Sequence, residues 1–309
     1  MPELSIIIPA YNEEKRIRNT LDEYVDFFSA RYGNNYELLV MTDGCTDNTV
    51  PIVKQYCSCH PQVFNYHYEG RRGKGGAIIE GFRNARGEVI ACADADGSIN
   101  AEWLYSLLTN LNGDDGVIAS RYMDGAEIAV KQPVARRIAS RAFNVLVRSL
   151  FGLSYRDTQC GGKILRTHAA KSIAGSIITT NFAFDIDMLY QLNRRGFKIR
   201  EVPVKWDDKK GSSVKLFRTS ITMFLAVFRL RIVNSPFVLL IQLGQRISDS
   251  LPSSVGDART HQNSNPEFKA QSIIKPTIKH HAVSYKERKE DLADFKSARK
   301  KKTLPANNI

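Results

Sequence analysis

Residues 87–98, Gly-Glu-Val-Ile-Ala-Cys-Ala-Asp-Ala-Asp-Gly-Ser, decide the fold of this chain. The apolar run from Val89 to Ala93 is typical of a buried strand, and it ends at Asp94 and Asp96, one residue apart. Ligands of open α/β sheets bind at the carboxyl edge of the strands. Two carboxylates there suit a hard divalent cation that also takes oxygens from a diphosphate. An acidic turn on a solvated edge explains the stretch equally well, so the choice depends on what surrounds it.

Strand-like and helix-like segments alternate through the first 120 residues. Strands are predicted at 4–8, 36–42, 63–68, 89–93 and 116–120, and helices at 12–30, 46–57, 77–86 and 101–111. We expect Asn12 to cap the first helix, and Thr46 or Asp47 to cap the second. This alternation predicts an α/β fold with a doubly wound, mostly parallel central sheet flanked by helices.

After Arg121 the pattern changes. Helices are predicted at 133–151, 181–194 and 215–233, a strand at 198–206, and a glycine-containing segment at 157–165. The helices at 133–151 and 215–233 carry Arg and Lys beside Leu, Ile, Val and Phe. Such amphipathic helices either pack on the sheet or lie in a membrane interface, apolar side inward; interfacial binding is the interpretation we favour.

The charge is uneven along the 309 residues. The formal net charge is +12, and the stretch from Gln245 onward holds 13 Lys and Arg against 7 Asp and Glu with few large apolar residues. We expect one folded domain over 1–235, a short apolar segment at 236–244, and a basic, disordered tail at 245–309. A basic balance indicates anionic partners such as nucleotides or phospholipid headgroups, and no signature of specific nucleic-acid binding occurs.

Several protein classes are disfavoured. The five cysteines are scattered, and Cys57, Cys59 and His60 lack a second ligand pair at zinc-finger spacing. We interpret the cysteines as reduced thiols of a cytosolic protein. No signal peptide precedes Leu4, and no apolar run reaches the roughly 18 residues that predict a membrane span.

Three further motifs lie at predicted strand ends or in the loops beyond them. Pro9-Ala10-Tyr11-Asn12-Glu13 follows the first strand, Asp43 follows the second, and Lys74 lies in the run Gly73–Gly76. A helix start presents N–H groups to a base or phosphate, and Lys74 adds positive charge. Asp43 either binds a ribose hydroxyl or base N–H, or caps a helix. Because parallel strands share one carboxyl edge, these motifs and Asp94–Asp96 together favour a site for a nucleoside diphosphate and a cation.

The combined motifs resemble those of the inverting family-2 glycosyltransferases of GT-A fold. They are Ile8-Pro9-Ala10-Tyr11-Asn12-Glu13, Asp43-Gly44-Cys45-Thr46-Asp47, Gly73-Lys74-Gly75 and Asp94-Ala95-Asp96. The second half is similar to the dolichyl-phosphate β-glucosyltransferases, with the dolichyl-phosphate mannose synthases slightly further off. The segments that carry this similarity are Ser120-Arg121-Tyr122, Tyr155 to Lys163, Phe182 to Asp187, Trp206 and Gly211 to Lys215. The resemblance covers about residues 4–233.

The chain departs from the family pattern at four points. Thr42 stands where the family often has an acid, and Gly162 where the eukaryotic glucosyltransferases carry an aromatic residue. Their N-terminal membrane anchor is missing. A Gln-x-x-Arg-Trp motif is also missing, which argues against a processive polysaccharide synthase.

The resemblance implies transfer of a hexose, with inversion, from a nucleotide sugar to a polyprenyl (dolichyl) phosphate with the help of Mg²⁺ or Mn²⁺. UDP-glucose is the expected donor and GDP-mannose the alternative. A non-catalytic nucleotide-sugar-binding membrane scaffold is the alternative from another class. We expect a nucleotide-sugar half at about 1–120, an acceptor half at about 121–235, and a cytoplasmic protein, peripheral on the cytosolic face of a membrane. The oligomeric state stays open.

The resemblance also implies roles for individual residues. The nucleotide sugar would contact Pro9, Ala10, Tyr11, Asn12, Glu13, Asp43, Lys74, Asp94 and Ala95. The cation would be held by Asp94 and Asp96. The acceptor phosphate would be bound by Arg121, Arg136 (or Arg137 if the register shifts by one), Ser140 and Lys215. The expected catalytic residues are Asp96, Arg121 and Asp185; Asp187 is a second acid in the same region, and helix capping or structural pairing explains both acids equally well.

Overall fold

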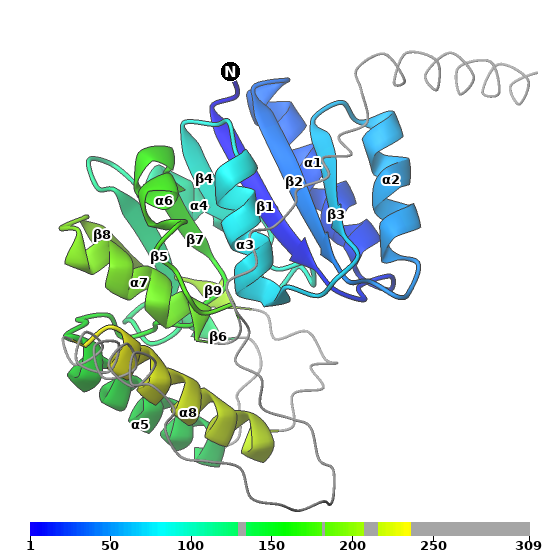
Figure 1. Ribbon diagram of the computed structural model, residues 1–309. Helices are drawn as coiled ribbons and strands as arrows, with labels where there is room; N and C mark the ends of the chain where they lie inside the picture. Colours follow the sequence, from blue (N-terminus) through cyan, green and yellow to red (C-terminus); the bar gives the residue numbers. More distant parts are fainter. Residues whose placement is uncertain (129–133, 181–182, 207–215, 236–309) are drawn as a thin grey trace, which may run out of the picture.

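The computed structural model describes residues 1–128, 134–180, 183–206 and 216–235 (Figure 1). Within these ranges, only the backbone is described for residues 128, 134–138, 205–206 and 216–222. The predicted apolar segment at 236–244, the predicted tail at 245–309 and Lys215 therefore lie outside the described residues.

A seven-stranded sheet forms the centre of the fold. Its spatial order is β3-β2-β1-β4-β7-β5-β8. The strands are β1 (Leu4–Ala10), β2 (Tyr36–Asp43), β3 (Val63–Tyr68), β4 (Val89–Cys92), β5 (Gly116–Ser120), β7 (Lys163–Arg166) and β8 (Ile199–Pro203). All neighbours pair in parallel except β7, which is antiparallel to both β4 and β5. The prediction of a mostly parallel sheet is confirmed.

Helices cover both faces of this sheet (Figure 1). They are α1 (Ile17–Tyr32), α2 (Thr49–Cys59), α3 (Gly73–Asn84), α4 (Ala101–Thr109), α5 (Val134–Phe151), α6 (Thr167–Ile173), α7 (Phe184–Arg194) and α8 (Leu216–Val233). One apolar core lies between the sheet and α1, α2 and α4, and a second between the sheet and α3, α6 and α7. Successive residues of β1 point into different cores, Ile6 and Ile8 into the first and Ile7 into the second. This two-sided burial explains why the strands read as continuous apolar runs.

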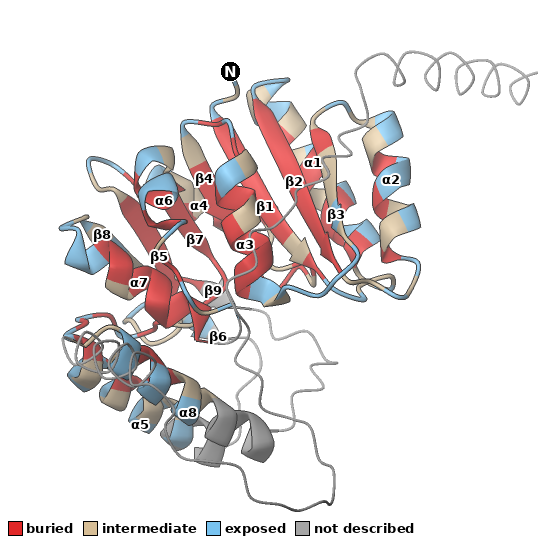
Figure 2. Cartoon of the chain, in the orientation of Figure 1, coloured by how far each residue is buried: buried red, intermediate tan, exposed pale blue. Residues whose placement is uncertain are grey.

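Helices α5 and α8 pack side by side, apart from α1 and α2 (Figure 1). Val147 and Phe151 of α5 and Val227 and Leu230 of α8 are buried and extend the second core. Much of the remaining described surface of both helices is exposed (Figure 2). Among the described residues, no helix is long and apolar enough to cross a bilayer.

Three helix starts differ from the sequence-based prediction. Helix α1 begins at Ile17 and is not capped by Asn12, which has a positive φ of 54° and accepts a hydrogen bond from Thr46 N through its side chain. Helix α2 begins at Thr49, although Asp47 accepts from Thr49 N as an acid at a helix start does. Helix α3 begins at Gly73, so the glycine-rich run predicted to precede the helix forms its first turn.

The second half also holds elements that the prediction missed. The glycine-containing segment ends in the antiparallel strand β7, and the short helix α6 follows it directly. The strand predicted at 198–206 is two pieces, since β9 (Lys205–Trp206) leaves the main sheet and pairs with β6 (Glu127–Ile128). Strand β7 lies between β4 and β5, with Lys163 paired to Cys92 of β4 and Gly161 against the side chain of Asp94.

Candidate active site

A cavity of about 320 Å³ lies at the carboxyl ends of β1, β2 and β4. Its lining residues are Pro9, Ala10, Tyr11, Glu13, Asp43, Arg71, Lys74, Ala77, Asp94, Ala95 and Asp96. The structure thus brings together all the predicted nucleotide-sugar and cation residues except Asn12, whose side chain hydrogen-bonds Thr46. The sequence-based prediction missed Arg71, which lies in the loop that leads into α3 and so close to Lys74.

Lys74 and Asp94 form an ion pair inside the cavity. The Lys74 Nζ lies 2.5 Å from Asp94 Oδ1. Burial alone would raise the pKa of Asp94, but the Lys74 ammonium outweighs it and the pKa is lowered. Likewise, desolvation would lower the pKa of Lys74, but the Asp94 carboxylate raises it. Both groups are therefore charged at neutral pH.

Gly161 permits this position of Asp94. A Cβ built on Gly161 would overlap Asp94 Oδ2, so the side chain lies directly against the backbone that leads into β7. The glycine thus makes room for the carboxylate, and the segment leading into β7 packs directly against Asp94.

Asp96 faces the cavity with an accessible carboxylate. Its Oδ1 accepts a hydrogen bond from Ser98 N at 3.0 Å, and its side chain keeps 32% exposure. Arg16 Nη1 is 3.7 Å from Asp96 Oδ2. The same guanidinium donates two shorter hydrogen bonds to Glu13, from Nε to Oε2 at 2.7 Å and from Nη2 to Oε1 at 2.8 Å. Burial raises the pKa of Glu13 despite Arg16. Asp96 is therefore the acid of the pair that is less occupied by a direct cationic contact.

The carboxylates of Asp94 and Asp96 suit a cation that is also bound by a substrate. Within the described ranges, no group of three or more His, Cys, Asp or Glu side chains is arranged to hold a metal ion. Asp94 is occupied by Lys74, which leaves Asp96 with open positions. Mg²⁺ is commonly held by one or two carboxylates together with substrate phosphates and water, so the residues present fit such an ion.

Asp43 holds the start of α3. Its Oδ1 accepts from Arg72 N at 2.7 Å, and its Oδ2 accepts from Gly73 N at 2.8 Å. Gly73 has a φ of +82°, and a Cβ there would also overlap the carbonyl oxygen of Thr180. The capping interpretation of Asp43 therefore holds, and the same carboxylate also lines the cavity.

Tyr11 and Arg71 form a stacked pair at the cavity. The Arg71 guanidinium lies 3.6 Å from the centroid of the Tyr11 ring, and Tyr11 remains 38% exposed. A partly exposed aromatic ring beside a guanidinium is suited to contact with a planar base.

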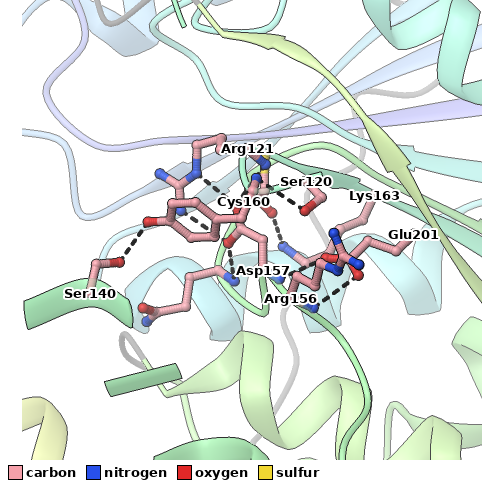
Figure 3. Close-up of polar contacts among 10 residues, drawn as sticks. Ser120, Arg121, Ser140, Arg156, Asp157, Cys160, Lys163 and Glu201 are labelled. Atoms are coloured by element: carbon pink, nitrogen blue, oxygen red, sulfur yellow. Dashed lines mark hydrogen bonds and ion pairs between the residues drawn. The ribbon is translucent and has the colours of Figure 1, made fainter. Parts of the chain in front are cut away.

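A second polar group lies where β5 ends (Figure 3). Arg121 binds Asp157 through two hydrogen bonds, Nε to Oδ2 at 2.7 Å and Nη2 to Oδ1 at 3.1 Å. Burial would raise the pKa of Asp157, but the guanidinium lowers it. Ser140 of α5 shares a 2.7 Å hydrogen bond with the hydroxyl of Tyr122. Of the predicted acceptor residues, Arg121 is thus fixed by Asp157, and Ser140 of α5 is linked to the adjacent residue, Tyr122.

The other predicted acceptor and catalytic residues lie elsewhere. Asp185 Oδ1 is 2.8 Å from Lys163 Nζ, both side chains are largely buried, and neither lines the cavity. Asp187 accepts hydrogen bonds from Ile178 N, Thr179 N and the Thr179 hydroxyl, which is the structural pairing foreseen as one interpretation. Arg136 and Arg137 lie on α5 where only the backbone is described, and Lys215 lies outside the described residues.

Comparison with known proteins defines the class. The fold matches glucosyl-3-phosphoglycerate synthase from Mycobacterium tuberculosis, a structure with Mn²⁺, UDP-glucose and phosphoglyceric acid, at a TM-score of 0.53 and 15% identity. That match covers 76% of this chain and 81% of the other, and it shows a shared GT-A glycosyltransferase fold.

The chain belongs to glycosyl transferase family 2, whose family model matches residues 5–173. It is 33% identical to dolichyl-phosphate beta-glucosyltransferase ALG5C of Trichomonas vaginalis over 69% of this chain and 66% of the relative, just under two thirds of its length. It is 34% identical to dolichyl-phosphate beta-glucosyltransferase of Saccharomyces cerevisiae over 71% of each chain. The predicted family, fold and glycosyltransferase class are confirmed.

Proposed function

We propose that this chain transfers glucose from UDP-glucose to dolichyl phosphate with inversion at the anomeric carbon. The observation that carries the proposal is the cavity in which Asp96 lies beside the Lys74–Asp94 pair. The names of the relatives in trichomonads and yeast support the sugar and the acceptor. Its rivals, transfer of mannose from GDP-mannose and sugar binding without transfer, are outcomes of the experiment below.

The donor would bind across the carboxyl edge of β1, β2 and β4. The Tyr11–Arg71 stack offers a face for the base, and Asp43 offers carboxylate oxygens to the nucleoside. Lys74 lines the same cavity and would offer its ammonium to the diphosphate. We propose this edge, about residues 1–120, as the nucleotide-sugar half of the domain.

A divalent cation would be held by Asp96, with Asp94 next to it. When bound, it would neutralise the charge that grows on the departing nucleoside diphosphate. Lys74 acts on the same oxygens, and Asp94 keeps its ammonium in place at 2.5 Å. We propose Mg²⁺ or Mn²⁺, and the Mn²⁺ in the M. tuberculosis structure of the same fold supports this choice.

The acceptor phosphate would bind in the half formed by about residues 121–235. Arg121 is always charged, and its planar guanidinium matches phosphate oxygens. Because the acceptor is already an anion at neutral pH, it attacks without a strong general base. This fits a site in which Asp185 is balanced by Lys163. A catalytic role of Asp185 stays a prediction, to be tested by Asp185→Asn.

A lipid acceptor requires access to a membrane surface. Five apolar side chains of α8 are 41–60% exposed: Phe224, Leu225, Phe228, Ile232 and Val233. Exposed arginines accompany them, Arg229 on α8 and Arg141 and Arg148 on α5. Helices of this kind bind in the plane of a bilayer interface. We propose peripheral attachment of α5 and α8 to the cytosolic face of a membrane.

The experiment is a donor panel. Purified protein, dolichyl phosphate and Mg²⁺ or Mn²⁺ are incubated with UDP-glucose, UDP-N-acetylglucosamine or GDP-mannose, and glycolipid is extracted. Only UDP-glucose should yield product, and Asp96→Asn should remove it while Glu102→Asn, an exposed acid of α4, should not. A product from GDP-mannose alone would support the mannose alternative. Binding of donors without any product would support the scaffold.

A further inference from the structure

Arg121 is held at the end of a chain of contacts that begins on the outermost strand of the sheet. Glu201 of β8 accepts hydrogen bonds from two consecutive backbone groups, Arg156 N at 2.9 Å and Asp157 N at 2.7 Å. Asp157 in turn binds the Arg121 guanidinium (Figure 3). Glu201 therefore reaches Arg121 through one short loop segment.

Glu201 supplies acceptors to two backbone groups of the loop between α5 and β7. Residues 152–162 connect α5 to β7 without regular helix or strand. Buried or half-buried N–H groups in such a segment need acceptors. The two oxygens of Glu201 satisfy two neighbouring N–H groups at once. A neutral glutamine has only one oxygen, so it would satisfy fewer of these donors.

Asp157 links the loop to the guanidinium of Arg121 and so fixes the position of that group. Its carboxylate is 2% exposed and accepts from Arg121 N, Nε and Nη2 as well as from Gln159 N. A carboxylate with this many donors has little freedom to rotate. The direction of the Arg121 side chain is therefore set by the position of the 156–157 backbone.

The pairing of β5 with β8 also connects Glu201 with Arg121. β5 and β8 run in parallel, with Ile118 opposite Glu201 and Ser120 opposite Pro203. Arg121 follows Ser120 directly. Glu201 thus joins the loop to the strand pair that carries Arg121, and none of the described cavity-lining residues lies on β8.

We propose that Glu201 is a positioning residue for the acceptor phosphate, which it serves by holding the 156–157 segment, Asp157 and Arg121 in one arrangement. The inference rests on the proposed function, in which Arg121 contacts that phosphate. Glu201 itself touches neither substrate. A planar cation that must match phosphate oxygens loses effectiveness with small displacements, and misplacement by about 1 Å costs roughly 100-fold.

The test compares Glu201→Ala and Glu201→Gln with Arg200→Gln. Arg200 is the adjacent residue on β8, and its Nε binds Asp114 at 2.6 Å, away from the loop. We expect Glu201→Ala to raise the KM for dolichyl phosphate about 10- to 100-fold, Glu201→Gln to raise it less, and Arg200→Gln to leave it unchanged. The Kd of UDP-glucose, measured by calorimetry, should stay the same in all three. An unchanged acceptor KM in Glu201→Ala, or equal losses for donor and acceptor, would overturn the proposal.

A second measurement keeps this proposal separate from the proposed function. In ¹⁵N-arginine-labelled protein, the Nε–H resonance of Arg121, assigned with Arg121→Lys, should be protected from exchange. Protection should be lost in Glu201→Gln and kept in Arg200→Gln. Unaltered protection in Glu201→Gln would contradict the positioning role even if transfer occurs. Absence of glycolipid from the wild-type protein, with protection lost as expected, would instead contradict the proposed function alone.

Discussion

The ammonium of Lys74 lies 2.5 Å from Oδ1 of Asp94, and this ion pair joins the first turn of α3 to the end of β4. It brings a cation from the glycine-rich turn to the acid pair that ends a buried strand. The donor diphosphate would therefore meet a lysine whose position is fixed before binding. Preorganised charge of this kind is a large contributor to catalysis.

Lys74→Met should lower kcat/KM for UDP-glucose by about 100- to 1,000-fold, because a charge aimed at the departing diphosphate is lost. Lys74→Arg should retain part of the activity. Lys171→Met, at an exposed position of α6, should behave as wild type. Steady-state kinetics measure the three values, and wild-type rates in Lys74→Met would remove Lys74 from the mechanism.

Gly161→Ala should impair catalysis more than stability. The added methyl group would overlap Asp94 Oδ2, so the carboxylate that holds Lys74 must move. We expect a loss of transfer with a change of about 1 kcal/mol in the free energy of unfolding. Gly175→Ala is the matched control, since a Cβ at Gly175 meets nothing within 4 Å. Equal activity in the two variants would show that the position of Asp94 is not critical.

Stability should fall in acid. The pKa values of Asp94 and Asp157 are lowered from their ordinary 3.8 by Lys74 and Arg121, which outweigh burial. The unfolded chain therefore takes up protons at these groups first, and their contribution is complete above pH 3.8 and is lost as the pH falls below it. Urea unfolding at pH 7, 5 and 3.5 measures this. Asp157→Asn should flatten the acid decline, whereas Asp124→Asn, a fully exposed acid, should not.

Replacing Phe224 and Phe228 by glutamine should weaken binding to vesicles of phosphatidylcholine with phosphatidylserine. The two rings stack at 6.3 Å on the exposed side of α8. Each buried aromatic side chain contributes about 1.5–3 kcal/mol, so each substitution should lower the partition coefficient at least about tenfold. Ile178→Gln, equally exposed at 55% but outside α8, is the control. Sedimentation with vesicles gives the answer, and unchanged binding would exclude this face as the attachment surface.

Local pattern was sufficient for the first half of the fold. The apolar runs that form β1, β2, β4 and β5 are almost entirely buried, so the sequence pattern predicts their lengths and order, and with them the acidic edge. β7 was not readable, because four residues after a pair of glycines carry no alternation that distinguishes an antiparallel strand. The residue type of Asn12 predicts a helix cap, but its left-handed backbone and its hydrogen bond with Thr46 depend on a loop 34 residues away.

In the candidate site, too, some features could be predicted from the sequence and others could not. Residues at strand ends could be predicted because parallel strands share one edge, and the cavity contains nearly all of them. Partners that come from distant segments could not: Arg71 over Tyr11, Asp157 on Arg121, and Lys163 on Asp185. These pairs exist only after the loops close, and they decide which charges are occupied and which remain for a ligand.

The anomeric configuration of the lipid product tests the central claim most directly. UDP-α-glucose, dolichyl phosphate and Mg²⁺ or Mn²⁺ are incubated with the purified protein, and the glycolipid is examined by NMR for the coupling between H1 and H2 of the sugar. Inverting transfer to the phosphate predicts dolichyl β-glucosyl phosphate, with one UDP released for each molecule formed. An α-linked product, or UDP release without any glucosylated lipid, would contradict it.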